Sequence, residues 1–141
     1  MTGLRKTCLL KKRVIKIIKI EDWMSKPVRS VKKDMSVKKA VEMMDTNNIG
    51  VLPVVGENDA PVGVVTERDI IRRVVAKGEN WENKVISDIM TENPITIKHD
   101  ASILEATRLM SENNFRRLLV VKKGKLVGVI TAKDVIEVMS A

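Results

Sequence analysis

The sequence is poor in aromatic residues, cysteine and histidine. Its 141 residues include two tryptophans, one phenylalanine and no tyrosine, so the core has to be built from aliphatic side chains. The one cysteine, Cys8, excludes an internal disulfide and favours a reducing, cytoplasmic setting. The one histidine, His99, has no second histidine or nearby cysteine with which to bind zinc. We therefore expect no metal site and no resident cofactor.

Catalytic and membrane-spanning patterns are also missing. The sequence contains neither a P-loop nor a G-x-G-x-x-G motif, and it groups no nucleophile with a base and an oxyanion donor. No apolar run approaches the roughly 18 residues that a membrane span requires. Basic residues at 11–13 interrupt the apolar start of the chain, which excludes a signal-peptide pattern. We expect a protein of the cytoplasm that is not an enzyme and has no membrane partner.

The positive charge is concentrated at the N-terminus. The net charge is +8, yet residues 1–20 hold seven basic residues and no acid, whereas the rest of the chain holds 19 basic and 18 acidic residues. Residues 1–19 form a basic leader, which is either a solvated tail or an anion-binding arm. Nucleic-acid binding through this arm is the alternative function, although the remaining sequence offers few aromatic side chains for base stacking.

An internal repeat organises the rest of the chain. The stretch GVVTERDII at 63–71 returns as GVITAKDVI at 128–136. Upstream, the pattern Asp-x-Met followed by proline occurs at 22–27 and again at 88–94. The sequence predicts repeats at 20–76 and 86–141, joined by a linker at 77–85.

Each repeat has the same expected order of elements, β-α-β-β-α. Val37, Ala40, Val41 and Met44 form one apolar helical stripe, and Ser102 with Glu105 predicts a capping box at the matching helix of the second repeat. The expected extended segments are 28–31, 51–55, 62–65, 95–97, 118–121 and 126–130, and the final helices begin at Thr66 and Thr131.

The Thr-x-x-Asp patterns at 66–69 and 131–134 have two interpretations. A threonine followed three residues later by an acid is an ordinary helix cap. A helix start, a hydroxyl and a carboxylate also suit a nucleotide, because backbone N–H groups bind phosphate and a carboxylate accepts hydrogen bonds from ribose hydroxyls. Gly63 and Gly128 lie three residues before the threonines, where a missing Cβ allows close approach.

These tandem motifs resemble the CBS domain family. The resemblance covers the chain from about residue 20 and implies an α/β (α+β) fold, with two pseudo-twofold-related repeats packed through their sheets. It implies a regulatory, energy-sensing module that binds AMP, ADP or ATP, with S-adenosylmethionine and NAD as further candidate ligands. It also implies a homodimer and a protein target that responds to ligand occupancy.

The resemblance further implies two ligand sites, each drawing on both repeats. Site A would consist of Thr66, Asp69, Pro94, Ile95, Phe115, Arg116 and Arg117. Site B would consist of Thr131, Asp134, Lys26, Pro27, Val28, Ile49, Gly50 and Val51. Guanidinium groups bind phosphate in bidentate fashion, so we expect site A to be the tighter nucleotide site.

Overall fold

The computed structural model describes residues 17–26 and 28–140. Most of the basic leader, with Cys8, and the predicted site residue Pro27 lie outside this part of the chain. Within it, no helix is long and apolar enough to cross a membrane.

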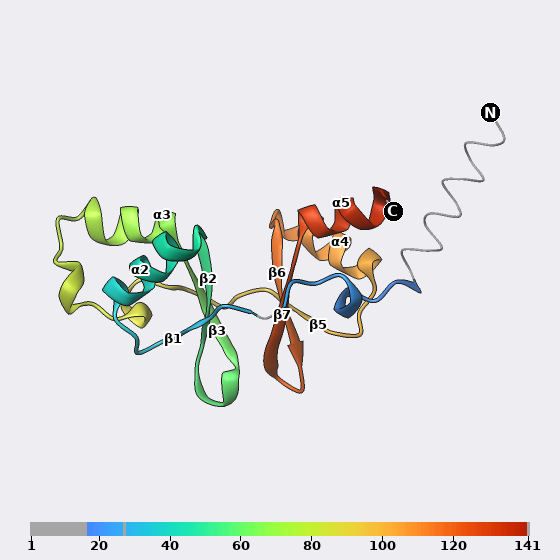
Figure 1. The fold of residues 1–141 in the computed structure, drawn as a ribbon, viewed down its shortest axis with the longest axis horizontal. Helices are drawn as coiled ribbons and strands as arrows, with labels where there is room; N and C mark the ends of the chain where they lie inside the picture. Colours follow the sequence, from blue (N-terminus) through green and yellow to red (C-terminus); the bar gives the residue numbers. More distant parts are fainter. Residues whose placement is uncertain (1–16, 27, 141) are drawn as a thin grey trace. The chain divides into compact units, whose positions relative to one another are not determined.

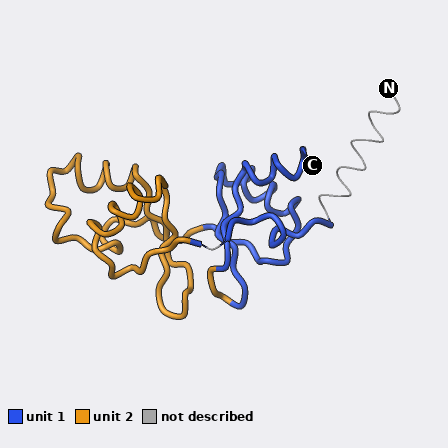
Figure 2. The backbone as a smooth tube through the Cα atoms, in the orientation of Figure 1, with its two compact units in different colours: residues 1–28, 95–123, 127–141 blue, residues 29–94, 124–126 orange. Residues whose placement is uncertain are grey.

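The described residues form two compact units that interleave along the sequence (Figure 2). Unit 1 takes the described residues up to 28 together with 95–123 and those from 127 onward. Unit 2 takes 29–94 and 124–126. Each unit has its own apolar core.

Unit 2 contains a four-stranded sheet in the order β1-β2-β3-β4. Strand β1 pairs in parallel with β2, whereas β2, β3 and β4 pair in antiparallel fashion, and helices α2 and α3 lie beside the β2–β3 hairpin (Figure 1). A π-helical turn, η3, continues α3, and short 3-10 turns complete the unit. The bounds are β1 Val31–Lys32, α2 Val37–Asn47, β2 Val51–Val55, η2 Glu57–Asp59, β3 Pro61–Thr66, α3 Glu67–Ile70, η3 Ile71–Val75, η4 Trp81–Asn83, η5 Ile86–Asp88 and β4 Thr91–Glu92.

Unit 1 contains a three-stranded sheet in the order β5-β6-β7, with β5 parallel to β6. Helices α4 and α5 pack against each other beside this sheet (Figure 1). The unit begins with a 3-10 turn at the N-terminal end of the described chain. The bounds are η1 Ile20–Asp22, β5 Thr96–Lys98, α4 Ile103–Asn113, β6 Arg117–Lys122, β7 Lys125–Thr131 and α5 Ala132–Ser140.

These elements confirm the mixed α/β class and most of the expected order. The apolar stripe of α2 is buried at Val37, Ala40 and Met44, as the helical spacing predicts. The strand expected at 28–31 is shorter and begins later in the sequence, because only the two residues of β1 pair with β2 in this region. At α4, the structure shows the Ser102 half of the predicted capping box, in which the Ser102 side chain accepts a hydrogen bond from the Glu105 N–H.

Both long helices end on asparagine for a conformational reason. Asn48 after α2 and Asn114 after α4 adopt left-handed backbone angles, with φ values of 52° and 55°. Asparagine tolerates this region better than most residues with a side chain. The repeated asparagine therefore ends the helix and turns the chain toward the central strand of each repeat.

The Asp-x-Met segments pack on the other repeat's elements. Ile20 is fully buried in the core of unit 1, together with residues of α4, β6 and β7. Its N–H donates to the Ala101 carbonyl at 3.0 Å. Ile86 and Ile89 are buried in the core of unit 2 in the same way. Each segment that begins a sequence repeat therefore belongs to the compact unit built mainly from the other repeat.

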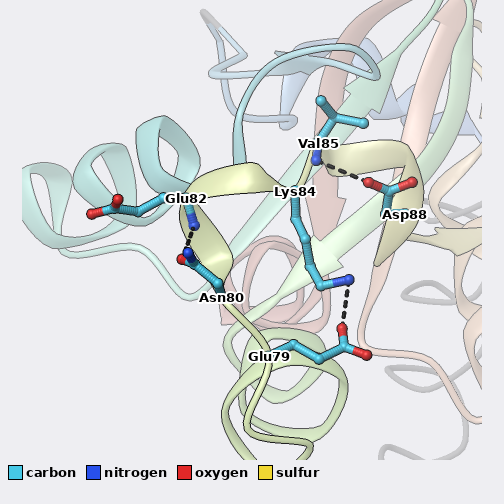
Figure 3. Close-up of polar contacts among 6 residues, drawn as sticks. All are labelled: Glu79, Asn80, Glu82, Lys84, Val85 and Asp88. Atoms are coloured by element: carbon cyan, nitrogen blue, oxygen red, sulfur yellow. Dashed lines mark hydrogen bonds and ion pairs between the residues drawn. The ribbon is translucent and has the colours of Figure 1, made fainter.

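The predicted linker, residues 77–85, is part of unit 2, and Figure 3 shows polar contacts of its residues. Lys84 Nζ lies 2.5 Å from Glu79 Oε2, and the contact lowers the pKa of the Glu79 carboxyl and raises the pKa of the Lys84 amine. Asn80 accepts from the Glu82 N–H at 3.0 Å, which caps η4. Asp88 of the Asp-x-Met motif accepts from the Val85 N–H at 3.0 Å, so in this repeat the motif aspartate has a capping role.

Candidate functional site

The predicted site residues divide between the two units. Unit 2 holds Ile49, Gly50, Val51, Thr66, Asp69 and Pro94. Unit 1 holds Lys26, Val28, Ile95, Phe115, Arg116, Arg117, Thr131 and Asp134. Site A and site B each combine residues of both units, and their assembly stays a prediction. The local geometry within each unit is described below.

In unit 2, Thr66 and Asp69 form a reciprocal cap at the junction of β3 and α3. The Thr66 N–H donates to Asp69 Oδ2 at 2.9 Å, and the Asp69 N–H donates to Thr66 Oγ1 at 3.0 Å. The hydroxyl of Thr91, from β4, donates to Asp69 Oδ1 at 3.1 Å. Asp69 is the one charged residue among the buried side chains of the described chain, with 9% of its surface exposed. The two bonds to Oδ1 and Oδ2 fix the orientation of its carboxylate.

In unit 1, Thr131 and Asp134 repeat the cap at the junction of β7 and α5. The Thr131 N–H donates to Asp134 Oδ2 at 2.8 Å, and the Thr131 hydroxyl donates to the same oxygen at 2.9 Å. The Asp134 N–H donates to Thr131 Oγ1 at 3.2 Å. Within the described residues, Oδ1 of Asp134 has no hydrogen-bond partner from the protein, and it is not buried.

Both caps leave part of the hydrogen-bonding capacity of the carboxylate unused. An ionised carboxylate offers about four acceptor positions, and the protein uses two on Asp69 and two on Asp134. In the part of the chain that the structure describes, the two ion pairs join Lys84 to Glu79 and His99 to Glu21, so neither aspartate is paired with a basic side chain. The capping interpretation holds in both repeats, and it leaves acceptor positions for vicinal hydroxyls.

The start of the central strand lies beside the cap in each unit. In unit 2 the Glu67 N–H donates to the Gly50 carbonyl at 3.0 Å. In unit 1 the Ala132 N–H donates to the Arg116 carbonyl at 2.8 Å. Arg116 and Arg117 are exposed, and 51% of the surface of Phe115 is exposed. Unit 1 therefore presents two guanidinium groups where unit 2 presents Gly50 and Val51.

The space beside each motif glycine is filled by other atoms of the protein. A Cβ on Gly63 would lie 2.9 Å from Met90 Sδ and 2.7 Å from the carbonyl oxygen of Thr91. A Cβ on Gly128 would collide with the Sδ of Met24. Each Asp-x-Met methionine thus packs directly over the glycine of the unit that it completes. The sequence predicted a close approach at these glycines, and the structure shows that atoms of the protein itself make it.

The two glycines should respond differently to alanine. Gly63→Ala is expected to destabilise the protein by about 1–3 kcal/mol, because its Cβ meets a strand backbone that has little freedom to move. Gly128→Ala should cost less, since the three atoms nearest to its Cβ all belong to the flexible Met24 side chain. Urea unfolding would measure both, with Met24→Ala expected to relieve the clash in the Gly128→Ala background. An equal or larger loss for Gly128→Ala would contradict this packing.

His99 pairs with the N-terminal segment of its own unit. Its Nδ1 lies 2.7 Å from Glu21 Oε2, across 78 positions of sequence. This hydrogen bond lowers the pKa of the Glu21 carboxyl. The contact links η1 to the end of β5, and the sequence alone indicated no partner for this histidine.

Comparison with known proteins identifies the family. The family model described as CBS domain matches residues 20–76 and 86–141. The chain belongs to the CBS domain family. An uncharacterized protein of Methanopyrus kandleri, MK0525, is 38% identical over 96 residues, which cover 67% of this chain and 49% of that protein. This chain thus spans about half the length of that relative.

Solved structures of CBS proteins have the same fold. CBSX2, whose crystal structure is a complex with AMP, shares 30% identity and a TM-score of 0.73, with 87% of this chain and 96% of that chain covered. The CBS domain pair of MJ0100, solved in complex with 5-methylthioadenosine and S-adenosyl-L-methionine, shares 30% identity and a TM-score of 0.74, with 88% and 97% covered. The resemblance seen in the motifs is therefore confirmed at the level of family and fold.

Several residues near these CBS motifs were not singled out from the sequence. Thr91 orients Asp69 from β4, and Glu67 lies beside Gly50. Met24 and Met90 fill the space over the motif glycines. The Asp-x-Met pattern signalled the two methionines, whereas nothing in the sequence distinguishes Glu67 from the other acids of a helix first turn.

Proposed function

We infer that this chain is a regulatory module that binds adenosine-containing ligands, with AMP, ADP and ATP as the main candidates. The observation that carries the proposal is the state of Asp69 and Asp134. Each carboxylate is held by its cap, retains unused acceptor positions and has no basic partner within the described residues. Such a group suits the two vicinal hydroxyls of a ribose.

The charge on the central strand of unit 1 supports a phosphorylated ligand. Arg116 and Arg117 stand exposed at the start of β6, and their guanidinium groups match the geometry of a phosphate. The proposal assigns these arginines to the phosphate of the ligand and the capped aspartates to its ribose. CBSX2 in complex with AMP provides a precedent within the family.

A regulatory role follows from how such a site would act. A ligand shifts a conformational equilibrium only by its different affinity for the two states. A ligand whose ribose and phosphate are both bound would favour the conformation in which the binding groups are in place. The proposed consequence is a change that a partner protein detects, with no chemical step on the ligand.

We include a homodimer in the proposal, on the basis of apolar side chains at the surface. Ile71 and Val75 of η3 are 58% and 66% exposed, and Ile136 and Met139 of α5 are 64% and 40% exposed. Ile71 and Ile136 occupy the same position of the nine-residue repeat. Clustered apolar side chains on a surface are typical of protein interfaces.

Thermal unfolding with a panel of ligands tests the proposal. AMP, ADP, ATP, S-adenosylmethionine and NAD would each be added at increasing concentration to the full chain. A ligand at 100 times its Kd stabilises the folded state by about 2.7 kcal/mol, so a true ligand should raise the Tm in proportion to the logarithm of its concentration. Inosine monophosphate is a matched control for recognition of the base. A panel in which no compound raises the Tm would contradict the proposed function.

A further inference from the structure

The side chain of Glu67 folds back over the start of β2. An added Cβ on Gly50 would lie 3.1 Å from Glu67 Cδ, 3.1 Å from Oε1 and 3.4 Å from Oε2. The Glu67 N–H also donates to the Gly50 carbonyl, so both the backbone and the side chain of Glu67 lie beside Gly50. The carboxylate therefore occupies the space that the missing side chain of Gly50 leaves open.

The corresponding position in unit 1 lacks this carboxylate. Ala132 follows Thr131 as Glu67 follows Thr66, and its N–H makes the same backbone bond, to the Arg116 carbonyl. The backbone geometry is thus repeated, while the side chains differ in charge. The start of β2 therefore lies beside the Glu67 carboxylate, whereas the start of β6 carries Arg116 and Arg117 beside Ala132.

The charge of Glu67 is not compensated by a salt bridge. Among the described residues, the two ion pairs involve Glu79 and Glu21, and no basic side chain lies within salt-bridge distance of Glu67. Glu67 is exposed, so its charge acts on whatever approaches the start of β2. Two like charges a few ångströms apart near a protein surface repel by an amount that changes binding constants at least tenfold.

We propose that Glu67 is a specificity-determining residue that excludes phosphate from the start of β2, so that the site using Ile49, Gly50 and Val51 accepts adenosine compounds without a phosphate. Uncharged nucleosides and cationic adenosine derivatives fit this requirement, whereas AMP is directed to the site that uses Arg116 and Arg117. The inference rests on the proposed function, because it assigns different ligand classes to its two sites. The tighter nucleotide binding expected at site A would then have two physical causes. One is attraction by the arginines, and the other is repulsion of phosphate by Glu67 at the start of β2.

A purely structural role for Glu67 makes a different prediction. An acid in the first turn of a helix stabilises the helix dipole wherever its side chain points. Removing the charge would then lower stability slightly and leave ligand choice unchanged. Selectivity and stability therefore need to be measured on the same variants.

Calorimetric titration of AMP and of adenosine into the full chain separates these roles. The wild type should bind one tight equivalent of AMP, and Glu67→Gln should bind a second with its affinity raised at least about tenfold. Glu67→Lys should strengthen the second AMP event further. Adenosine affinity should change less than twofold in Glu67→Gln. Glu82→Gln, at an exposed acid of the same unit, is the matched control and should behave as the wild type.

The outcomes distinguish this inference from the proposed function. If the wild type already binds two equivalents of AMP with equal affinity, Glu67 excludes nothing and the inference fails. It fails as well if AMP binds once and neither substitution at Glu67 changes the second event. If neither AMP nor adenosine binds the wild type or any variant, the proposed function falls and takes this inference with it.

Discussion

Replacing Ile20 by alanine is expected to destabilise the protein by about 2–5 kcal/mol, the usual loss for truncating a large buried aliphatic side chain. Ile20 lies near the N-terminal end of the described chain, where substitutions are ordinarily tolerated. It is nevertheless fully buried in the core of unit 1, among residues of α4, β6 and β7. The truncated side chain would leave a cavity between elements of the second repeat. Chemical unfolding would measure the loss.

The position of the effect is as informative as its size. Hydrogen exchange should show that Ile20→Ala weakens protection in α4 and β6 of the second repeat before it affects α2 and β2. Ile86→Ala should do the reverse, since Ile86 is fully buried in unit 2. Ile17→Ala is a matched control, because Ile17 is 76% exposed and its truncation should change stability by less than about 0.5 kcal/mol. Loss of protection mainly in α2 and β2 after Ile20→Ala would contradict the exchanged packing.

The sequence could predict the elements but not this exchange. The apolar spacing of α2, the alternating strands and the Thr-x-x-Asp helix starts are local signals, and the structure follows them. The segments at 20–24 and 86–90 have the same pattern, so either could complete either repeat. Their partners depend on where the chain leads after the prolines, and periodicity carries no information about that path. The contacts of Met24 with Gly128 and of Met90 with Gly63 supply it.

Replacing Asp69 by alanine is expected to weaken AMP binding at least tenfold. The proposed role of this carboxylate is to accept two hydrogen bonds from the ribose, and bonds to a charged acceptor are worth about 1.5–3 kcal/mol each. Thr66 and Thr91 hold the carboxylate in a fixed orientation, which limits the entropy lost when ribose binds. Calorimetry with AMP, compared between the variant and the wild type, measures the effect.

Matched variants separate binding from folding. Asp69→Ala also removes the cap of α3 and should lower stability by about 1 kcal/mol, so binding is measured at a temperature where the variant remains folded. Thr91→Ala removes one orienting bond and keeps the carboxylate, and it should weaken AMP binding less than Asp69→Ala. Asp134→Ala should reduce AMP affinity less than Asp69→Ala, because the arginines are assigned to the site of Asp69. Equal losses of AMP affinity in Asp69→Ala and Asp134→Ala would contradict the expected difference between the two sites.

The proposed site was less predictable than the fold because its proposed selectivity depends on distances between side chains. The threonines, aspartates and arginines are recognisable by type and spacing. The bond from Thr91 to Asp69 joins positions 22 residues apart, and no pattern in the sequence marks it. Glu67 appears in sequence as an ordinary first-turn acid, and only its contact with Gly50 points to an effect on ligands. The predicted assembly of sites A and B from both repeats stays a prediction.

The central claim is that a capped aspartate in this CBS chain binds the ribose of an adenosine ligand. Calorimetric titration of AMP and 2′-deoxy-AMP into the wild-type chain tests it most directly, because the two ligands differ by one ribose hydroxyl. The account predicts that AMP binds and that 2′-deoxy-AMP binds at least about tenfold more weakly, since a charged acceptor loses one of its partners. Equal affinity for the two ligands, or no binding of either, would contradict it.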